Sequence, residues 1–236
     1  MIISAHQPAY NPWLGFIHKI LLSDIFVVMD DVQYEKNSFI NRNKILQNSS
    51  EVMLSIPVKM KNYQSKTLRD MLVVDQRWKT KHLKSIEQSY RKSKNYDQIF
   101  PIVEKIYQLE SEHLIDYTNE YLNLIVNYLS IETKIIYASS LNIEVKKLDY
   151  VCDMVRKLDG SLFVFGKQGK DYADVEYLEL KGIKSYFQDY QHPSYMQLSK
   201  KFHPYMGILD LLFNEDKQDV KSIILNNNIT KNKLEL

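Results

Sequence analysis

Two pairs of polar residues near the start of the chain have the side chains of a catalytic site. His6-Gln7 and Asp30-Asp31 each follow directly on a short apolar run. A histidine in such a place can hydrogen-bond a phosphate or carboxylate, or act as general acid or base. A nearby carboxylate can orient the ring or hold Mg²⁺, while the alternative for all of them is turn chemistry that shapes the loop. We therefore predict a catalytic centre built on His6, with Asp30 or Asp31 as its partner.

Other polar and aromatic residues are candidates for binding a substrate. Arg42 offers a bidentate fork for phosphate or carboxylate, or else a surface ion pair. The turn from Gly166 to Gly169 offers backbone amides that can cradle an anion, although it is neither a Walker motif nor a dinucleotide fingerprint. The predicted binding residues are Gln7, Tyr10, Trp13, Tyr34, Asn37, Asn41, Arg42, Ser139, Gly166, Gly169, Tyr195 and Gln197.

His82 is a further catalytic candidate, because a predicted helix carries it together with Trp78 and could bring it over the edge of a sheet. The alternative is a solvated helix face. His192 and His203, each followed by proline, could line the same cleft or serve as loop turns. The chain has no Gly-x-Ser-x-Gly elbow, no His-Glu-x-x-His and no paired Cys-x-x-Cys, so serine hydrolase, zinc protease and zinc ribbon readings have no support.

The elements that must position the first candidates form a strand, loop, helix and strand. Residues 2–5 and 24–29 are apolar runs typical of buried strands, and residues 13–21 carry apolar side chains at helical spacing. Such a unit belongs to a parallel sheet, which places ligands outside the carboxyl ends of its strands. Pro8 and Pro12 keep the connecting loop out of helical conformation. The four polar residues should therefore meet at one edge of the sheet.

The remaining chain predicts an α/β fold with a mostly parallel, Rossmann-like sheet flanked by helices. Further strands are expected at 52–58, 68–74, 134–138, 161–165 and 185–190, and helices at 78–91, 100–109, 114–129, 150–158 and 204–213. Pro101 is tolerable if it lies in the first turn of its helix. We expect one domain over residues 1–225, a helical insertion at about 78–129, and a loose tail at 226–236.

Composition limits the classes of partner. The 236 residues carry a formal net charge of +2, with lysines scattered among acids, which gives no reason to expect nucleic acid. The single cysteine, Cys152, excludes an intrachain disulfide and sits in an apolar helical pattern, where it should behave as a hydrophobe. No stretch is long enough to span a membrane, and no signal peptide precedes the first strand. We expect a cytoplasmic protein.

Several motifs together resemble the WbqC-like protein family. They are HQPAYNPWLGF, DDVQYEKNSFINRN, Trp78 followed by Lys81-His82, the Ser139-Ser140 pair after a strand, FGKQGKDY, and YMQLSKKFHPYMGILDLLFN. The resemblance covers the chain from Met1 to about Asn214, and its one departure is Gly207, where a serine is expected. It implies a place in the biosynthesis of bacterial surface polysaccharides, O-antigen or capsule, where nucleotide-activated amino sugars are often acylated.

Our first hypothesis is therefore an N-acyl or aminoacyl transferase. Its partners would be a nucleotide-linked sugar and an acyl or aminoacyl donor, with His6 as general acid or base. One alternative is an ATP-dependent ligase that adenylates a carboxylate, although the chain has a single His where the nucleotidyltransferase signature has two. Another is a non-catalytic sugar-nucleotide binding factor. Cofactors and metal requirement stay open, and a homodimer is one expected assembly.

Overall fold

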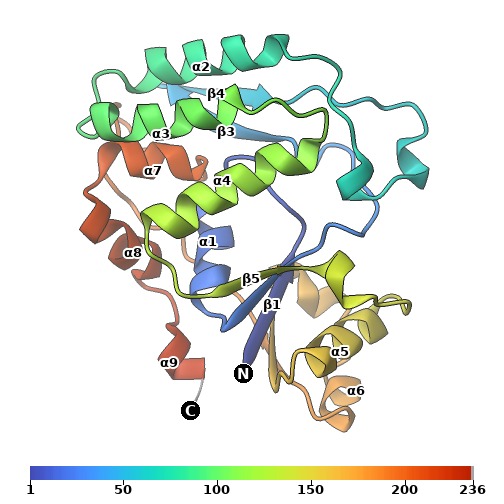
Figure 1. Ribbon diagram of the computed structural model, residues 1–236. Coiled ribbons are helices and arrows are strands. Elements are labelled where there is room, and N and C mark those ends of the chain that lie inside the picture. The colour runs from blue at the N-terminus through green and yellow to red at the C-terminus, as the bar shows by residue number, and fades with distance from the viewer. Residues whose placement is uncertain (235–236) are drawn as a thin grey trace.

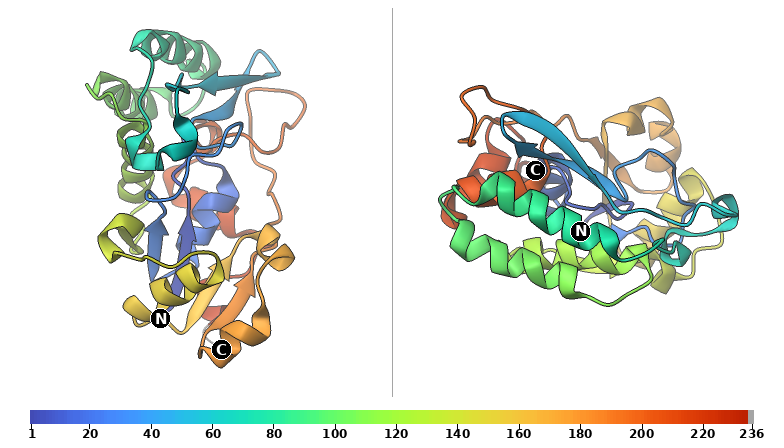
Figure 2. Two further views of the ribbon diagram at one scale, coloured as in Figure 1. Left: turned by 90° about the vertical axis from the view of Figure 1, so that its right-hand side faces the viewer. Right: turned by 90° about the horizontal axis from the view of Figure 1, so that it is seen from above.

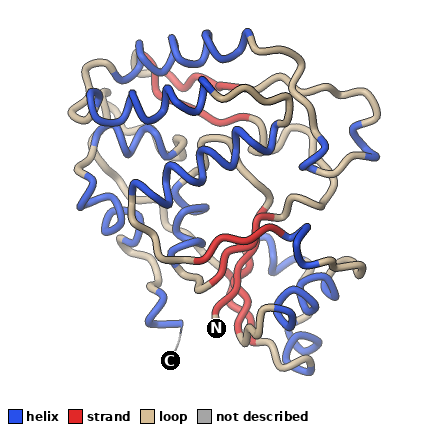
Figure 3. Tube along the Cα trace, in the orientation of Figure 1, coloured by secondary structure: helices blue, strands red, loops and turns tan. Residues whose placement is uncertain are grey.

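A five-stranded parallel sheet forms the centre of the computed structural model, which describes residues 1–234 (Figures 1 and 3). Its strands, in spatial order, are β5 (Lys134–Tyr137), β2 (Ile25–Val28), β1 (Ile2–His6), β6 (Leu162–Phe165) and β7 (Lys184–Phe187). All four neighbouring pairs are parallel. The chain proceeds outward from β1 to β2 and β5, then returns to β6 and β7 on the other side of β1, as in Rossmann-like folds. This confirms the predicted α/β class.

Helices cover both faces of the sheet, because alternate residues of each strand point to opposite faces. Ile3 and Ala5 of β1 pack in one apolar cluster with α5 (Leu148–Lys157) and α6 (Val175–Leu180). The opposite face packs against α1 (Leu14–Leu21) and the C-terminal helices. The remaining helices are α2 (Arg77–Tyr90), α3 (Tyr96–Gln108), α4 (Leu114–Tyr128), α7 (Ile208–Asn214), α8 (Lys217–Leu225) and α9 (Lys231–Leu234).

The segment between β2 and β5, here called the insertion, is rich in helices. It contains α2, α3 and α4 and also an antiparallel hairpin of β3 (Arg42–Gln47) and β4 (Ser50–Ser55). Figure 2, left, shows the parallel sheet toward one end of an elongated molecule and the hairpin with α2 and α3 toward the other. The carboxyl ends of the parallel strands point toward this insertion (Figure 1). The insertion therefore lies on the side of the sheet where ligands are expected.

Two strand predictions were wrong or incomplete. Residues 52–58 contribute to β4, but this strand pairs with β3 in a separate two-stranded sheet and ends at Ser55. Residues 68–74 do not form a strand, since Leu68–Asp70 is a short 3₁₀ helix and Leu72 and Val73 make only isolated bridges. Leu68, Met71 and Val73 are buried in a loop rather than in a ladder, which is why the apolar pattern misled the prediction.

Two helix predictions also needed correction, and three helices were missed. α3 begins at Tyr96, so Pro101 lies past the first turn, where its missing N–H leaves one intrahelical hydrogen bond unmade. α7 begins only at Ile208, because the preceding residues run as loop. α6, α8 and α9 were not predicted, and each of them has fewer than ten residues.

The described part of the C-terminal segment, residues 226–234, is attached to the parallel-sheet end of the molecule. The backbone carbonyl of Ile229 accepts a hydrogen bond from Nε2 of His18 at 2.9 Å. Lys231 pairs with Asp24 at 2.5 Å, and α9 follows. The last two residues of the expected loose tail, 235 and 236, lie outside the described residues. Within residues 1–234, no helix has the length and apolar character needed to span a membrane.

Candidate active site at the carboxyl edge of the sheet

The topological switch point of the sheet lies between β1 and β6, the position where open α/β sheets bind ligands. β1 pairs with β2 as far as His6, opposite Val28. Its pairing with β6 stops two residues earlier, at Ser4 opposite Val164. The two strands therefore part at their carboxyl ends, with His6 on one side of the opening and Gly166 on the other.

The ring of His6 is held in one tautomer. Its Nδ1 lies 2.8 Å from the carbonyl oxygen of Gln7, and because a carbonyl can only accept, Nδ1 must carry the proton. Nε2 then has a free lone pair, and it makes no hydrogen bond within residues 1–234. His6 is half-buried, and its Nε2 keeps some accessible surface. His6 is therefore set up to accept a proton or a hydrogen bond from a ligand.

Aromatic side chains surround this ring. Trp13 and Phe16 lie edge-on to His6, with ring centroids at 5.2 Å and 5.3 Å. Phe39, from the loop before β3, is 44% exposed and approaches Trp13 at 5.8 Å. The predicted binding residue Trp13 is thus beside the predicted base, and Phe39 is a residue of this wall that the sequence analysis missed. Such a wall offers apolar, flat surface to a sugar ring or base.

The surroundings keep His6 neutral. Burial lowers its pKa to about 4, with a smaller contribution in the same direction from the positive charge of Lys19 and an opposing one from the bond to Gln7. At neutral pH the lone pair on Nε2 is therefore available.

Lys19 is a charged residue of this region that the sequence analysis missed. It sits on α1 and is only 4% exposed, and its Nζ donates to the carbonyl of Ala5 at 2.8 Å. Burial lowers its pKa to about 7. The sequence carried one signal for it, a lysine on the apolar face of a predicted helix. Lysine is almost never buried at such a position unless it has a partner.

Asp30 and Asp31 do not orient His6. Oδ1 of Asp30 accepts from the backbone N–H of Ser139 at 2.9 Å, and Oδ2 accepts from the Ser139 hydroxyl at 2.6 Å. Asp31 accepts from the hydroxyl of Tyr150 at 2.7 Å. The structure thus brings the predicted residues Asp30 and Ser139 together, but as a clamp between the ends of β2 and β5. The carbonyl of Gln7 takes the orienting place at His6 instead.

The predicted anion turn follows β6 at the switch point. A methyl group placed on Gly166 would meet no atom within 4 Å, so this side of the opening is free. Gly169 instead packs on Phe165, where a methyl group would lie 2.6 Å from its Cβ. Lys167 pairs with Asp189 at 3.0 Å on the surface. Gly166 therefore leaves space beside the backbone at the end of β6, whereas Gly169 serves packing.

Arg42 and its neighbours stabilise the start of the hairpin. Tyr34 donates from its hydroxyl to Oδ1 of Asn41 at 3.0 Å, and Asn41 donates to the carbonyl of Ile56. Arg42 donates to the carbonyl of Asn37, while its Nε is buried without a partner. The group therefore holds the hairpin to the preceding loop, and the buried Nε of Arg42 has no accessible surface for an anion.

Tyr10 and His82 lie together, but in the core. The Tyr10 hydroxyl is 2.8 Å from Nδ1 of His82, and it continues to Tyr107 at 2.5 Å and on to Tyr121 at 2.7 Å. Tyr10 is fully buried and His82 is 6% exposed. Burial lowers the pKa of His82 to about 4. These two predicted site residues therefore connect the loop after β1 to the insertion and do not face a ligand.

Tyr195 and Gln197 also meet a buried partner, Asp210 on α7. Oδ2 of Asp210 accepts from the Tyr195 hydroxyl at 2.9 Å and from Nε2 of Gln197 at 2.7 Å, while Oδ1 accepts from Tyr90 at 3.0 Å. Asp210 is fully buried, and burial raises its pKa. The sequence analysis missed it, although a single acid within the apolar run ILDLLF is a recognisable signal.

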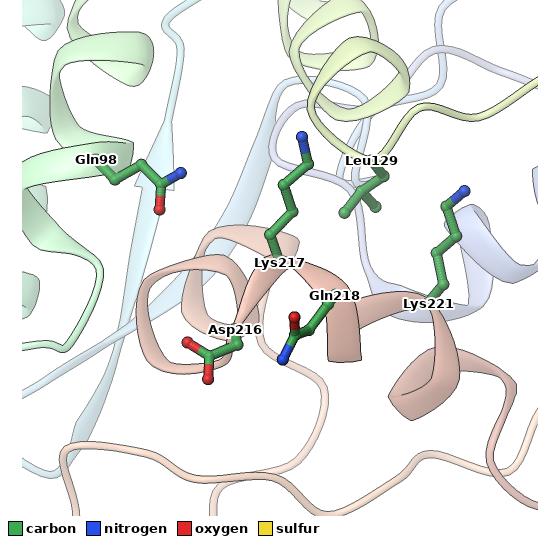
Figure 4. Close-up of a pocket in the computed structure, with 6 residues that line it drawn as sticks. All are labelled: Gln98, Leu129, Asp216, Lys217, Gln218 and Lys221. Atoms are coloured by element: carbon green, nitrogen blue, oxygen red, sulfur yellow. The ribbon is translucent and has the colours of Figure 1, made fainter.

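Two surface hollows lie away from this edge. The first, of about 680 Å³, is lined by Gln98, Leu129, Asp216, Lys217, Gln218 and Lys221 (Figure 4). Its lysines already have partners, since Lys217 lies over the ring of Tyr128 and Lys221 donates to the carbonyl of Ser130. The second, of about 610 Å³, lies between α5 and the start of β7. Across residues 1–234, no three His, Cys, Asp or Glu side chains converge as metal ligands would.

Comparisons with known proteins agree with the motif resemblance. The sequence profile of the WbqC-like protein family matches residues 7–222. An uncharacterized protein of Mycobacterium tuberculosis, Rv1507c, is 28% identical over 211 residues, which cover 88% of this chain and 91% of the relative. No solved structure matches the chain significantly.

Proposed function

The chain belongs to the WbqC-like protein family, and from this premise we propose that it is an enzyme of surface-polysaccharide biosynthesis that transfers an acyl or aminoacyl group to the amine of a nucleotide-activated sugar. Membership of the family supports a place in surface-polysaccharide biosynthesis. The residues at the carboxyl edge of the sheet support acyl transfer to an amine.

One observation carries the proposal: His6 presents an unpartnered, unprotonated Nε2 at the switch point. Two other histidines, His18 and His192, use both ring nitrogens. His18 accepts from Gln188 and donates to Ile229, and His192 donates to Pro193 and accepts from the backbone N–H of Tyr205. His6 thus combines a free ring nitrogen with the ligand-binding position of the fold.

The reaction we propose is attack of the sugar amine on the acyl carbonyl of an activated donor. The nitrogen lone pair forms the new N–C bond, and Nε2 of His6 accepts the proton that this nitrogen loses. The bond between the acyl carbon and its leaving group breaks, and the leaving group departs with the electron pair. The proton on His6 can then pass to the leaving group, which restores the neutral ring.

The aromatic wall and the parted strands supply the binding surface. Trp13 and Phe39 offer faces for the sugar or base. The open side of Gly166 lets a ligand approach the backbone at the end of β6 closely. Gln7, half-buried, completes the edge beside His6.

The first experiment is a thermal-shift screen of the purified protein against dTDP- and UDP-amino sugars, acyl-CoA, and ATP with Mg²⁺, because a ligand that binds the folded state raises its melting temperature. Hits are then assayed for transfer to the amine by mass spectrometry. His6→Gln is the test variant, and it should abolish transfer while the protein stays folded.

His192→Gln is the matched control, because His192 makes the same Nδ1 bond to the next carbonyl at 2.9 Å but has no free Nε2. It should retain transfer. Equal activity of His6→Gln and the wild type would overturn the assignment of the base. A shift with ATP alone would favour an adenylating ligase, and sugar binding without turnover would favour a binding factor.

A further inference from the structure

Lys19 is a buried charge that the proposed transferase mechanism leaves unused. It is 4% exposed, and no carboxylate of residues 1–234 lies within ion-pair distance of its Nζ. An ammonium group has three protons, and one of them is used in the bond to the carbonyl of Ala5. Burying a charge without a counter-charge is unfavourable, so a residue of this kind calls for a reason other than packing.

The bond to Ala5 lies at the point where β1 and β6 part. The carbonyls of Ile2 and His6 accept from Asp24 and Met29, on the β2 side. Because alternate residues of a parallel strand bond to opposite neighbours, the carbonyl of Ala5 faces β6. The ladder to β6 has already ended there, and Nζ of Lys19 takes the place of the missing strand donor.

Lys19 also lies on the same face of the sheet as His6. Ser4 and His6 are two residues apart on β1 and so share a face. The hydroxyl of Ser4 donates to the backbone carbonyl of Lys19, which places α1 over that face. The ammonium group therefore lies at the carbonyl of Ala5, where the ladder between β1 and β6 has ended, and close enough to His6 for its charge to lower the pKa of the ring.

The usual position for a phosphate in such folds is filled. In Rossmann-type sheets the glycine-rich N-terminus of the first helix receives the phosphate. Here a methyl group on Gly15, in the first turn of α1, would lie 3.1 Å from the ring of Tyr190 and 3.3 Å from that of Trp13. An anion at the switch point must therefore find its positive charge elsewhere.

We propose that Nζ of Lys19 binds an anionic group of the substrate, of the phosphate class, in the opening between β1 and β6. The inference rests on the proposed function and adds to it the residue that receives the diphosphate of the sugar nucleotide. The free side of Gly166 supplies the space, and the two unused protons of the ammonium supply the donors.

Binding at Lys19 has a consequence for His6. The charge of Lys19 is one of the causes that lower the pKa of His6. A bound anion would compensate that charge, so the pKa of His6 should rise when the ligand enters. His6 would then become a stronger base only with substrate in place.

The test uses inorganic pyrophosphate as the probe, with binding followed by thermal shift and calorimetry. We expect pyrophosphate to stabilise the wild type and Lys19→Met to weaken its binding at least tenfold. Lys221→Met is the control, since Lys221 also donates to a backbone carbonyl but from the surface of α8. It should bind as the wild type does.

A second measurement needs no variant and covers the case in which Lys19→Met does not fold. The ring ¹⁵N signals of His6 are titrated with and without pyrophosphate, and saturation with pyrophosphate should raise the pKa of His6. Unchanged binding in Lys19→Met, loss of binding in Lys221→Met instead, or an unchanged titration of His6 would each overturn the inference. The two proposals can fail separately. If Lys19→Met loses pyrophosphate binding and the wild type transfers no acyl group, the anion site is upheld and the transferase is refuted.

Discussion

The hydroxyl of Tyr10 lies 2.8 Å from Nδ1 of His82, which joins the loop after the first strand to the first helix of the insertion. His82 also bonds to the backbone of Ser55, so its other nitrogen must donate there and Nδ1 must accept from Tyr10. Tyr10 then accepts from Tyr107, and Tyr107 accepts from Tyr121. The four side chains thus form one chain in which each hydroxyl donates to the next residue, from Tyr121 to His82. Burial raises the pKa of Tyr10 well above its usual value.

Removing the Tyr10 hydroxyl should destabilise the fold. Tyr10→Phe leaves Nδ1 of His82 as a buried acceptor without a donor, which costs about 1–3 kcal/mol of the free energy of unfolding. The measurement is urea denaturation of the variant and the wild type. Tyr205→Phe is the control, because Tyr205 is 62% exposed, and its midpoint should not move. Equal midpoints for both variants would contradict the structural role of the chain.

His82 should also make the stability depend on pH. Its pKa is about 4 in the folded protein and 6.5 when unperturbed, so between these values only the unfolded state takes up the proton. The stability that buried, neutral His82 contributes to the folded state is therefore fully present above pH 6.5. It is lost as the pH falls toward 4, at about 1.4 kcal/mol per pH unit. Comparing unfolding free energies of wild type and His82→Gln at pH 6.5 and 5 should show a shallower slope in the variant. Parallel slopes would refute the assignment.

Asp30 and Ser139 should act as a structural pair. Each Asp30 oxygen accepts from Ser139, so Asp30→Asn and Ser139→Ala should each lower the free energy of unfolding, by about 1–3 kcal/mol. The double variant should cost less than the sum, as expected for residues in direct contact. A double-mutant cycle by urea denaturation measures the coupling. Strict additivity would show that the clamp is absent in solution.

Gly207 should resist substitution by the serine that the family resemblance suggests. A Cβ there would lie 2.1 Å from Nδ2 of Asn11, a distance that real Cβ atoms do not show. The hydroxyl is also unnecessary, because Oδ1 of Asn11 already accepts from the backbone N–H of Leu209 in the first turn of α7. Gly207→Ser should therefore lower the free energy of unfolding by about 1–3 kcal/mol. The melting temperature should fall by several degrees.

Gly166→Ala provides the comparison for Gly207→Ser, because a methyl group at Gly166 meets no atom within 4 Å and the backbone there has φ of −73°. Its melting temperature should stay near that of the wild type. A serine at Gly207 with wild-type stability would mean that Asn11 can move aside.

Local patterns in the sequence were sufficient for the parallel sheet and for the place of His6. Short apolar runs at 2–5, 24–29, 134–138 and 161–165 identify buried strands without reference to the rest of the chain, and each appears in the sheet. The residue that follows a strand is known once the strand is known, so the edge position of His6 followed directly. The hairpin from Arg42 to Ser55 could be recognised only in part, because its first strand, RNKILQ, does not alternate clearly.

Tertiary structure alone decided which polar residues pair with one another and which keep an unpaired atom. Asp30 closes on Ser139 across 109 positions, and Tyr195 meets Asp210, because a buried polar group must find a partner wherever the fold offers one. No local pattern specifies that partner. The sequence by itself determined the family, the sheet and the histidine at its edge. Packing determined the tautomer of that histidine, and it brought Lys19, a helix residue, to the carbonyl of Ala5 where the strands part.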